Sequence, residues 1–271
     1  LHGRHDAVFQ GGSERVQRHR GQRENQALWA RAVIFNRPIP LRVPACKLWL
    51  SAQTTRTMFQ DTGATSPVAS NTDPCKLWVD LSGNSNSPTA ASDAKRATYT
   101  TNIINSRPAL YWDGSDDNMS TPSLTLTSGC VFVVGRRSST GSFPGFCKLA
   151  STASDTGSNG ILQCSQAAVG ANWLFANPST GSFSKFTGQD IANNTNFIYY
   201  AQWGTTVSDV LVRVNQSTLT ADGGATYTQP SGSMPIWLAS GYSTNLWNGY
   251  LGEILVYSQI PTSTQYTAIE K

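Results

Sequence analysis

The chain has 271 residues, of which 39% are hydrophobic and only 13% are charged, so its charge content is low for a soluble protein. Ser, Thr, Asn and Gly fill the remainder, a composition that favours short strands joined by polar turns over helices. No apolar run reaches the roughly 18 residues of a membrane-spanning helix, so the sequence predicts no membrane span. No glycine-rich phosphate-binding motif is present, which excludes the common nucleotide-binding loops.

The first 44 residues form a basic segment with its own composition. Residues 1–45 contain eight arginines against three acids, whereas the rest of the chain is nearly neutral. Pro38, Pro40 and Pro44 favour an extended linker at the end of this segment. The sequence therefore predicts an N-terminal arm over residues 1–44 and one folded domain over residues 45–271.

The arm has three readings, which are nucleic-acid binding, membrane binding and docking onto a protein surface. Docking is favoured, because the segment lacks a clean amphipathic helix and ends in a proline-rich stretch. The predicted partners are other proteins of a larger assembly, such as a capsid or a tail, and nucleic acid is disfavoured. The arginines expected to dock are Arg15, Arg18, Arg20, Arg23, Arg31 and Arg37.

From Cys46 onward the chain reads as short strands separated by Gly, Pro, Asn and Asp. The final stretch "PTSTQYTAIEK" is the one helix expected, with Thr262 or Ser263 as its N-cap. Many strands and one terminal helix predict a sandwich of two antiparallel sheets. The expected strands are 46–51, 75–80, 108–113, 130–136, 145–150, 160–166, 196–203, 209–214, 235–240 and 249–257.

Two stretches are nearly identical, "CKLWLSA" from Cys46 and "CKLWVDLSG" from Cys75. A repeat architecture would need a longer match and a third copy, and neither is present. Zinc knuckles are excluded, because no two cysteines have the close spacing that such sites use. The stretches are therefore predicted to be two separate strands of one sandwich, each burying its tryptophan, Trp49 or Trp78.

Three motifs occur in order: "LWLSA", "LWVDLSGNSNSPTAAS" and "RPALYWDGSDDNM". Together with the closing stretch "NGYLGEILVYSQIPTSTQYTAIEK" they resemble the laminin-G-like domains of the concanavalin A-like lectin and glucanase superfamily. Ser51 stands where that family usually has Asp, and Trp112 stands where Phe is common. The resemblance covers residues 46–271 and implies an all-β jelly roll with a short C-terminal helix, of a type common in secreted and bacteriophage proteins.

The turn "DGSDDN" is a candidate calcium site. Calcium is bound by several oxygen ligands on one turn, and this stretch supplies Asp113, Asp116, Asp117 and Asn118. The alternative is a tight polar turn between strands that needs no ion.

Glycan binding would use aromatic platforms beside amides and hydroxyls on loops. The candidates are Trp173 and Asn177 in "GANWLFANPSTG", and Tyr242, Asn245 and Trp247 in "SGYSTNLWNGY". The alternative for the tryptophans is core packing, which is their usual role in a sandwich.

Five cysteines are present, and Cys147 and Cys164 flank a turn-like stretch between two expected strands. In a hairpin they would lie opposite one another, which allows a disulfide if the register is right. Two buried free thiols are the alternative.

The sequence argues against catalysis. All three histidines lie in the arm, so the domain has no Ser–His–Asp or Cys–His arrangement. The Glu-x-Asp-x-x-Glu motif of the glucanase relatives is absent, and the glutamate Glu253 reads as a structural residue. We therefore expect a non-catalytic virion-surface or extracellular module that docks through its arm and binds glycans. The alternatives are a structural decoration protein without a ligand and a glycoside hydrolase that uses Asp pairs.

Overall fold

The computed structural model describes residues 39–139, 144–152, 162–166, 171–176, 184–187, 191–222, 229–241 and 245–271. The chain divides into two compact units, Leu1–Arg42 and Val43–Lys271. Of the first unit, the described part is the short helix α2 (Ile39–Arg42). This helix corrects the prediction of an extended linker, because Pro40 lies in the first helical turn, where the missing N–H costs nothing.

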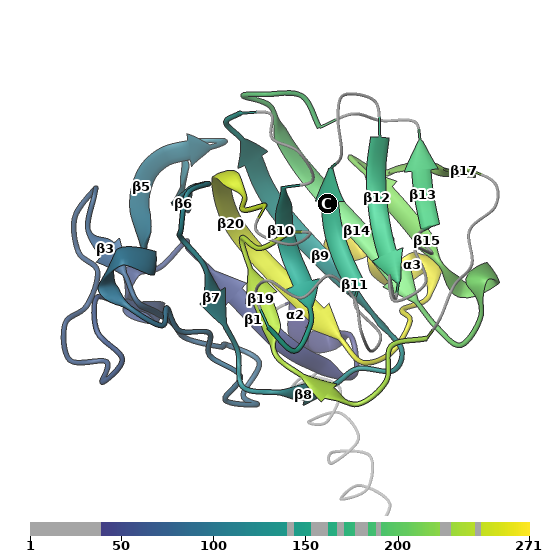
Figure 1. The fold of residues 1–271 in the computed structure, drawn as a ribbon, viewed down its shortest axis with the longest axis horizontal. Helices are drawn as coiled ribbons and strands as arrows, with labels where there is room; N and C mark the ends of the chain where they lie inside the picture. The colour runs from purple at the N-terminus through teal and green to yellow at the C-terminus, as the bar shows by residue number, and fades with distance from the viewer. Residues whose placement is uncertain are drawn as a thin grey trace, which may run out of the picture. The chain divides into compact units, whose positions relative to one another are not determined.

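The larger sheet of the second unit has nine strands in the order β16-β15-β14-β9-β20-β6-β5-β3, and β1 also pairs with β20. Its centre is formed by the long strands β9 and β20, and the pairings within it are antiparallel (Figure 1). The strands are β1 (Cys46–Ser51), β3 (Pro74–Cys75), β5 (Ala97–Ile104), β6 (Arg107–Asp113), β9 (Gly129–Arg137), β14 (Asn196–Trp203), β15 (Leu211–Val214), β16 (Ser217–Thr218) and β20 (Asn248–Tyr257).

The smaller sheet has seven strands in the order β17-β13-β12-β11-β10-β19-β7, also paired antiparallel. Two further pairs, β18–β8 and β2–β4, lie outside the two sheets. The strands are β2 (Met58–Phe59), β4 (Leu77–Trp78), β7 (Met119–Ser120), β8 (Leu124–Thr125), β10 (Gly145–Leu149), β11 (Leu162–Gln166), β12 (Ala171–Ala176), β13 (Ser184–Thr187), β17 (Thr220–Asp222), β18 (Ser233–Met234) and β19 (Ile236–Leu238).

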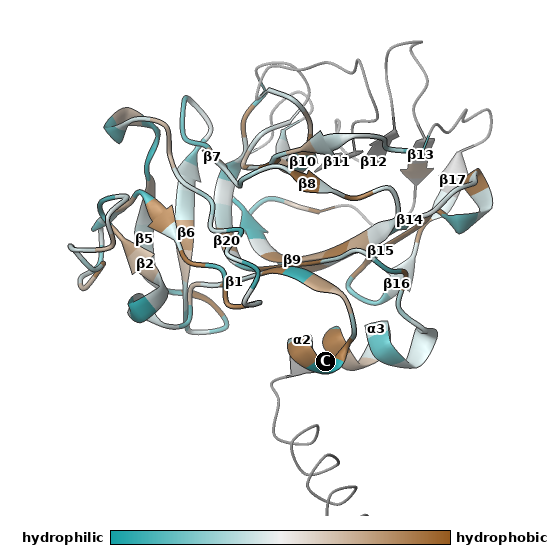
Figure 2. Cartoon of the chain, turned by 90° about the horizontal axis from the view of Figure 1, so that it is seen from below, coloured by the Kyte–Doolittle hydropathy of each residue, from teal (hydrophilic) through white to brown (hydrophobic). Residues whose placement is uncertain are grey.

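The two sheets pack face to face, and one hydrophobic cluster draws its side chains from both of them (Figure 2). Strand alternation decides which residues enter this core. In β19, for example, Ile236 and Leu238 are buried while Trp237 between them is half-buried. The fully buried tryptophans among the described side chains are Trp78, Trp112, Trp203 and Trp247.

The two similar stretches that start at Cys46 and Cys75 lie in different environments. The first forms β1, in which Leu48 and Leu50 point into the core, and Trp49 is half-buried on the outer face of the nine-stranded sheet. The second is divided between β3 and β4, and there Trp78 is buried. The prediction that each stretch buries its tryptophan in the core therefore holds for Trp78 and is wrong for Trp49, because the alternation of β1 places its leucines inside.

The free edge of β1 is covered by the loop that follows β4. Asp80 accepts hydrogen bonds from the Trp49 N–H at 3.0 Å and from the backbone N–H groups of Ser82 and Asn86. Ser82 Oγ and Asn86 Nδ2 donate to the Lys47 carbonyl, and Asn84 Nδ2 donates to the Cys46 carbonyl. The polar positions of "DLSGNSN" thus satisfy backbone groups that an edge strand would otherwise expose.

The C-terminal helix α3 (Ser263–Ile269) lies on the outer face of the nine-stranded sheet (Figure 2). Thr262 is its N-cap in a reciprocal pair with Gln265, which confirms one of the two predicted caps. At its other end Glu270 is 1% exposed and accepts two hydrogen bonds from the Arg213 guanidinium, at 3.0 and 3.1 Å. This bidentate pair fixes the helix to β15.

The all-β, antiparallel architecture with a C-terminal helix is confirmed. The expected strands 46–51 and 196–203 have the observed bounds, and the strands at 130–136 and 249–257 differ by one residue at one or both ends. The sequence missed β5, β12 and β13, since their polar or glycine-flanked stretches read as loops.

Replacing the buried Asp80 with alanine should destabilise the domain by about 2–4 kcal/mol, because it leaves the part-buried Trp49 N–H without its acceptor and releases the loop. Urea unfolding followed by tryptophan fluorescence measures the change. Asp93→Ala is the matched control, since its ion pair with Lys76 is exposed and its loss should leave the free energy of unfolding nearly unchanged. Equal losses in the two variants would contradict the role of Asp80 in covering the edge.

Candidate functional site

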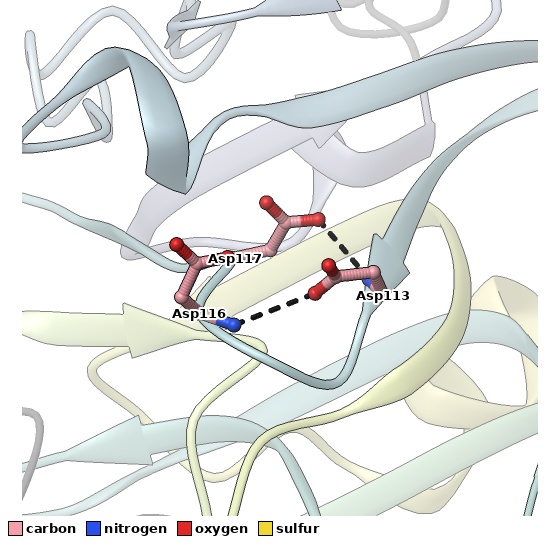
Figure 3. A group of neighbouring side chains, drawn as sticks. All are labelled: Asp113, Asp116 and Asp117. Carbon is pink, nitrogen blue, oxygen red and sulfur yellow. Dashed lines mark hydrogen bonds between the residues drawn. The ribbon is translucent and has the colours of Figure 1, made fainter.

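The acidic turn lies between β6 and β7 and brings three carboxylates together. Asp113, Asp116 and Asp117 each offer one oxygen, and these oxygens lie within 4.8 Å of one another (Figure 3). Among the described residues this is the one group of three such side chains close enough to hold a metal ion. Three of the four predicted calcium ligands are therefore neighbours in space as well as in sequence.

Backbone hydrogen bonds shape this turn. Asp113 Oδ1 accepts from the N–H groups of Ser115 and Asp116, while Asp117 Oδ2 accepts from the Asp113 N–H at 3.0 Å. Gly114 has a φ of +76°, and a Cβ there would lie 2.8 Å from the Cβ of Asn248. A glycine is needed at this position for both reasons.

Asp117 is the unusual member of the group, because it is only 6% exposed. Burial raises its pKa to about 7, and the neighbouring charges of Asp113 and Asp116 act in the same direction, against the hydrogen bond from the Asp113 N–H. Next to it, Asn118 is 4% exposed, and its Oδ1 has no hydrogen-bond partner. Carboxylate and amide oxygens are the ligands that calcium prefers, so the donor set fits this ion. Calcium binding at the turn stays a prediction.

A second candidate surface is the outer face of the seven-stranded sheet, which points away from the core. The pairing register of the strands and the alternation of their side chains show which residues lie on this outer face. Trp237 pairs with Ser120 and Lys148, and Lys148 pairs with Gln163. The inner positions of the same strands belong to the core cluster, including Cys147, Leu149, Ile236 and Leu238. By the same alternation, a neighbouring row on the outer face consists of Ser165, Trp173, Lys185 and Asp222.

Among the described side chains of this face, Trp237 offers a flat aromatic surface on which a ligand ring could stack. It keeps part of its surface exposed, and its indole N–H donates to the Ala150 carbonyl at 3.1 Å, which holds the ring in place. Lys148 beside it is fully buried and donates to the Gly241 carbonyl at 2.8 Å. Among the tryptophans whose side chains the structure describes, only Trp49 and Trp237 reach the surface, and they lie on opposite sheets.

The predicted glycan-binding residues are separated by the structure. Trp173 lies in β12 rather than in a loop, at a register position of the outer face. Trp247 is fully buried and packs edge-on against Phe146 and Phe197, which corrects its prediction as a loop platform. Asn245 is described and half-buried, and its carbonyl accepts from the Gly241 N–H at 2.7 Å. Asn177 and Tyr242 lie outside the described residues.

Sequence reasoning missed Trp237, although "MPIWLAS" carries the signal for it. An apolar residue on each side of a tryptophan in a short strand indicates that the tryptophan faces away from the core. The pairing of Trp237 with Lys148, on a strand nearly 90 residues earlier, carries no comparable local signal.

Glu253 lies on the outer face of the nine-stranded sheet. Its Oε1 accepts a hydrogen bond from the Trp49 indole N–H at 2.8 Å. Burial raises its pKa, and the bond from Trp49 and the charge of Arg107 oppose that shift. This hydrogen-bonded environment agrees with the structural role expected for Glu253.

Two predicted sites remain, the arginines of the arm and the cysteine pair. The arm arginines at 15–37 lie outside the described residues. Cys147 is a buried free thiol whose register partner in β11 is Cys164. No helix in the described part of the chain is long and apolar enough to cross a membrane.

No family model matches the sequence, and no curated protein matches it either. Similar solved structures exist at the level of fold. Domain 4 of AbnA, an extracellular GH43 arabinanase from Geobacillus stearothermophilus in complex with arabinotriose, is 12% identical with a TM-score of 0.54, and the match covers 84% of this chain and 98% of that domain.

Two larger enzymes also contain the fold. An arabinofuranosidase complexed with arabinofuranosyl-α-1,2-xylobiose is 12% identical, with a TM-score of 0.58 over 83% of this chain and 61% of that one. Trypanosoma rangeli sialidase is 10% identical, with a TM-score of 0.53 over 85% of this chain and 33% of the sialidase. The chain thus spans about a third of the sialidase and under two thirds of the arabinofuranosidase.

These structures establish a β-sandwich of a kind that occurs in carbohydrate-active proteins. They also correct the prediction that the chain is not an enzyme, because three structures with this fold come from glycoside hydrolases. The missing Glu-x-Asp-x-x-Glu motif excludes only one arrangement of carboxylates, and acids on other elements can serve the same chemistry.

The raised pKa of Asp117 predicts that stability falls as pH rises. In the unfolded chain Asp117 loses its proton near pH 4, whereas in the folded domain it keeps the proton to about pH 7. The free energy of unfolding should therefore decrease between about pH 4 and 7 and level off above that range. Asp117→Asn should remove this loss, on the order of 2–4 kcal/mol by pH 8, measured by urea unfolding at several pH values.

Asp93→Asn is the control, since Asp93 is exposed and its pKa is lowered by Lys76 rather than raised by burial. A parallel pH dependence in the wild type and Asp117→Asn would contradict the assignment. Calcium is tested on the same proteins. If the turn binds it, millimolar Ca²⁺ at pH 8 raises the melting temperature of the wild type and leaves that of Asp117→Asn unchanged.

Proposed function

We propose that residues 43–271 form a glycan-interacting domain of a carbohydrate-active protein, with the outer face of the seven-stranded sheet as its ligand surface. The observation that carries this proposal is the position of Trp237, which is half-exposed, held by its hydrogen bond to Ala150 and paired across the strands with Lys148 and Ser120. This position is distinct from the four fully buried tryptophans of the core.

The composition of this face supports a sugar ligand over a protein partner. Its register positions mix aromatic with polar residues and include Trp237, Trp173, Phe175, Gln163, Ser165, Lys185 and Asp222. An aromatic ring covers the apolar face of a sugar, and amide, hydroxyl and charged groups bond its hydroxyls. Trp237 and Trp173 lie three strands apart and two residues apart along the strand direction, or roughly 16 Å at the usual spacings, which suits an extended ligand better than a single sugar ring.

The type of sandwich and the extracellular setting are proposed from the motif resemblance and from the similar solved structures. The motif resemblance supports a laminin-G-like jelly roll, and the match with AbnA domain 4 covers nearly the whole of a domain whose structure contains arabinotriose. An extracellular setting belongs to the proposal for the same reason. Docking through the N-terminal arm and a virion setting remain predictions from the sequence.

The proposal predicts that tryptophan substitutions on the outer face of the seven-stranded sheet weaken glycan binding, whereas one on the outer face of the nine-stranded sheet does not. On a panel of immobilised oligosaccharides that includes arabinan and xylan fragments and sialylated glycans, the wild type should bind at least one glycan. Trp237→Ala and Trp173→Ala should each weaken that binding at least tenfold, because each removes one stacking surface.

Trp49→Ala is the matched control, since Trp49 is also half-exposed but lies on the outer face of the other sheet. It should bind like the wild type, provided that circular dichroism shows all variants folded. Loss of binding in Trp49→Ala with full binding in Trp237→Ala would overturn the proposal, as would a wild type that binds no glycan.

Hydrolysis is the second candidate function, and one observation favours it. Burial raises the pKa of Asp117 to about 7, and a second carboxyl, that of Asp113, lies beside it. Such a pair is what glycoside cleavage uses. Release of new reducing ends from the same glycans, abolished in Asp113→Asn and Asp117→Asn, would establish this function. A panel left intact by the wild type would rule it out for those glycans.

A further inference from the structure

We propose that Cys147 and Cys164 are a disulfide-forming pair, so that this domain carries a specific oxidative modification site between β10 and β11. The proposal does not depend on glycan binding. It rests on strand register, on the face that the pair occupies and on the positions of the other cysteines.

The register of the β10–β11 ladder places the two residues directly opposite each other. Cys147 pairs with Cys164, and the flanking pair Leu149–Leu162 keeps the same antiparallel register. Directly opposed residues in antiparallel strands have Cα atoms about 4.5 or 5.5 Å apart, and both distances lie within the range that a disulfide spans.

Both positions lie on the inner side of the seven-stranded sheet. Cys147 is 6% exposed, belongs to the core cluster and is a free thiol in the structure. A small apolar void adjoins it, lined among others by Leu126, Leu149 and Trp203. Room beside the sulfur allows a change of side-chain rotamer without a shift of the strands.

The other cysteines have no partner at such a position. Cys46 and Cys130 each pair with Tyr257 from opposite sides, so a whole strand separates them. Two strand spacings amount to about 9.5 Å, which exceeds the reach of a disulfide. Cys75 pairs with Ala97. Register therefore favours one pairing out of the five cysteines.

Formation of the bond oxidises two thiols and requires an acceptor of two electrons. A small-molecule disulfide such as oxidised glutathione supplies this. One cysteine thiolate attacks it and releases one glutathione thiolate, and the second cysteine thiolate then displaces the other, which forms the S–S bond. The two protons lost by the cysteines are taken up by the two glutathione thiolates, so the products are the disulfide and two reduced glutathiones. Burial raises the pKa of the Cys147 thiol to about 12, so the reaction belongs to folding rather than to the closed native state.

The bond would link β10 and β11 covalently, two strands of the seven-stranded sheet whose outer face is the proposed ligand surface. The pair next to the cysteines in the ladder is Lys148–Gln163, whose residues occupy that face. Closing the loop of 16 residues between Cys147 and Cys164 restricts the unfolded chain and should raise the melting temperature by about 5–10 °C.

The test uses the full chain refolded with oxidised and reduced glutathione, then unfolded in an alkylating reagent and weighed by mass spectrometry. We expect three alkylated cysteines and a proteolytic fragment in which the peptides of Cys147 and Cys164 are joined. Adding a reductant should lower the melting temperature by about 5–10 °C. Five alkylated cysteines, a different joined pair or glutathione bound to single cysteines would overturn the proposal.

Substitutions locate the effect independently of overall stability. Cys147→Ala and Cys164→Ala should abolish the reductant-dependent shift in melting temperature, whatever their absolute stability. Cys75→Ala is the matched control, because it removes another buried thiol that lies far from this ladder and should keep the shift. If either variant of the pair keeps the shift, or Cys75→Ala loses it, the assignment is wrong.

Discussion

Each of the two sheets buries one face against the other, and the hydrophobic cluster between them contains side chains from both. Because neighbouring side chains in a strand point to opposite faces, this burial fixes the direction of every residue in the ladder. It places Ile236 and Leu238 in the core and leaves Trp237 between them outside. The candidate ligand face is thus a consequence of how the core is built. A shift of β19 by one residue would bury Trp237 and expose its neighbours.

The sequence predicted the fold well where burial leaves a local pattern. The apolar runs of β9 and β20 predict buried strands directly, and the N-cap at Thr262 predicts the helix Ser263–Ile269. β5 was missed because its alternating threonines resemble a polar loop. The Asn and Ser residues around Trp247 predict a loop, yet its side chain packs between the sheets and is fully buried.

The candidate site was predictable only in part, because its residues meet through long-range pairing. The acidic turn is contiguous in sequence, so its carboxylates could be found directly, but the high pKa of Asp117 depends on burial that the sequence does not reveal. The outer face combines β19 with β10, β11 and β12, and no local pattern specifies that order. Trp173 is predicted to lie in a loop, whereas it lies in the strand β12, at a register position of the outer face.

A crystal structure of the full chain with the oligosaccharide that it binds most tightly would locate the ligand surface. We expect the sugar to lie on the outer face of the seven-stranded sheet, with one ring stacked on Trp237 and the sugar chain running across β10 and β11 toward β12. A sugar bound beside Trp49 and Glu253 on the other sheet, or at the acidic turn, would contradict this expectation.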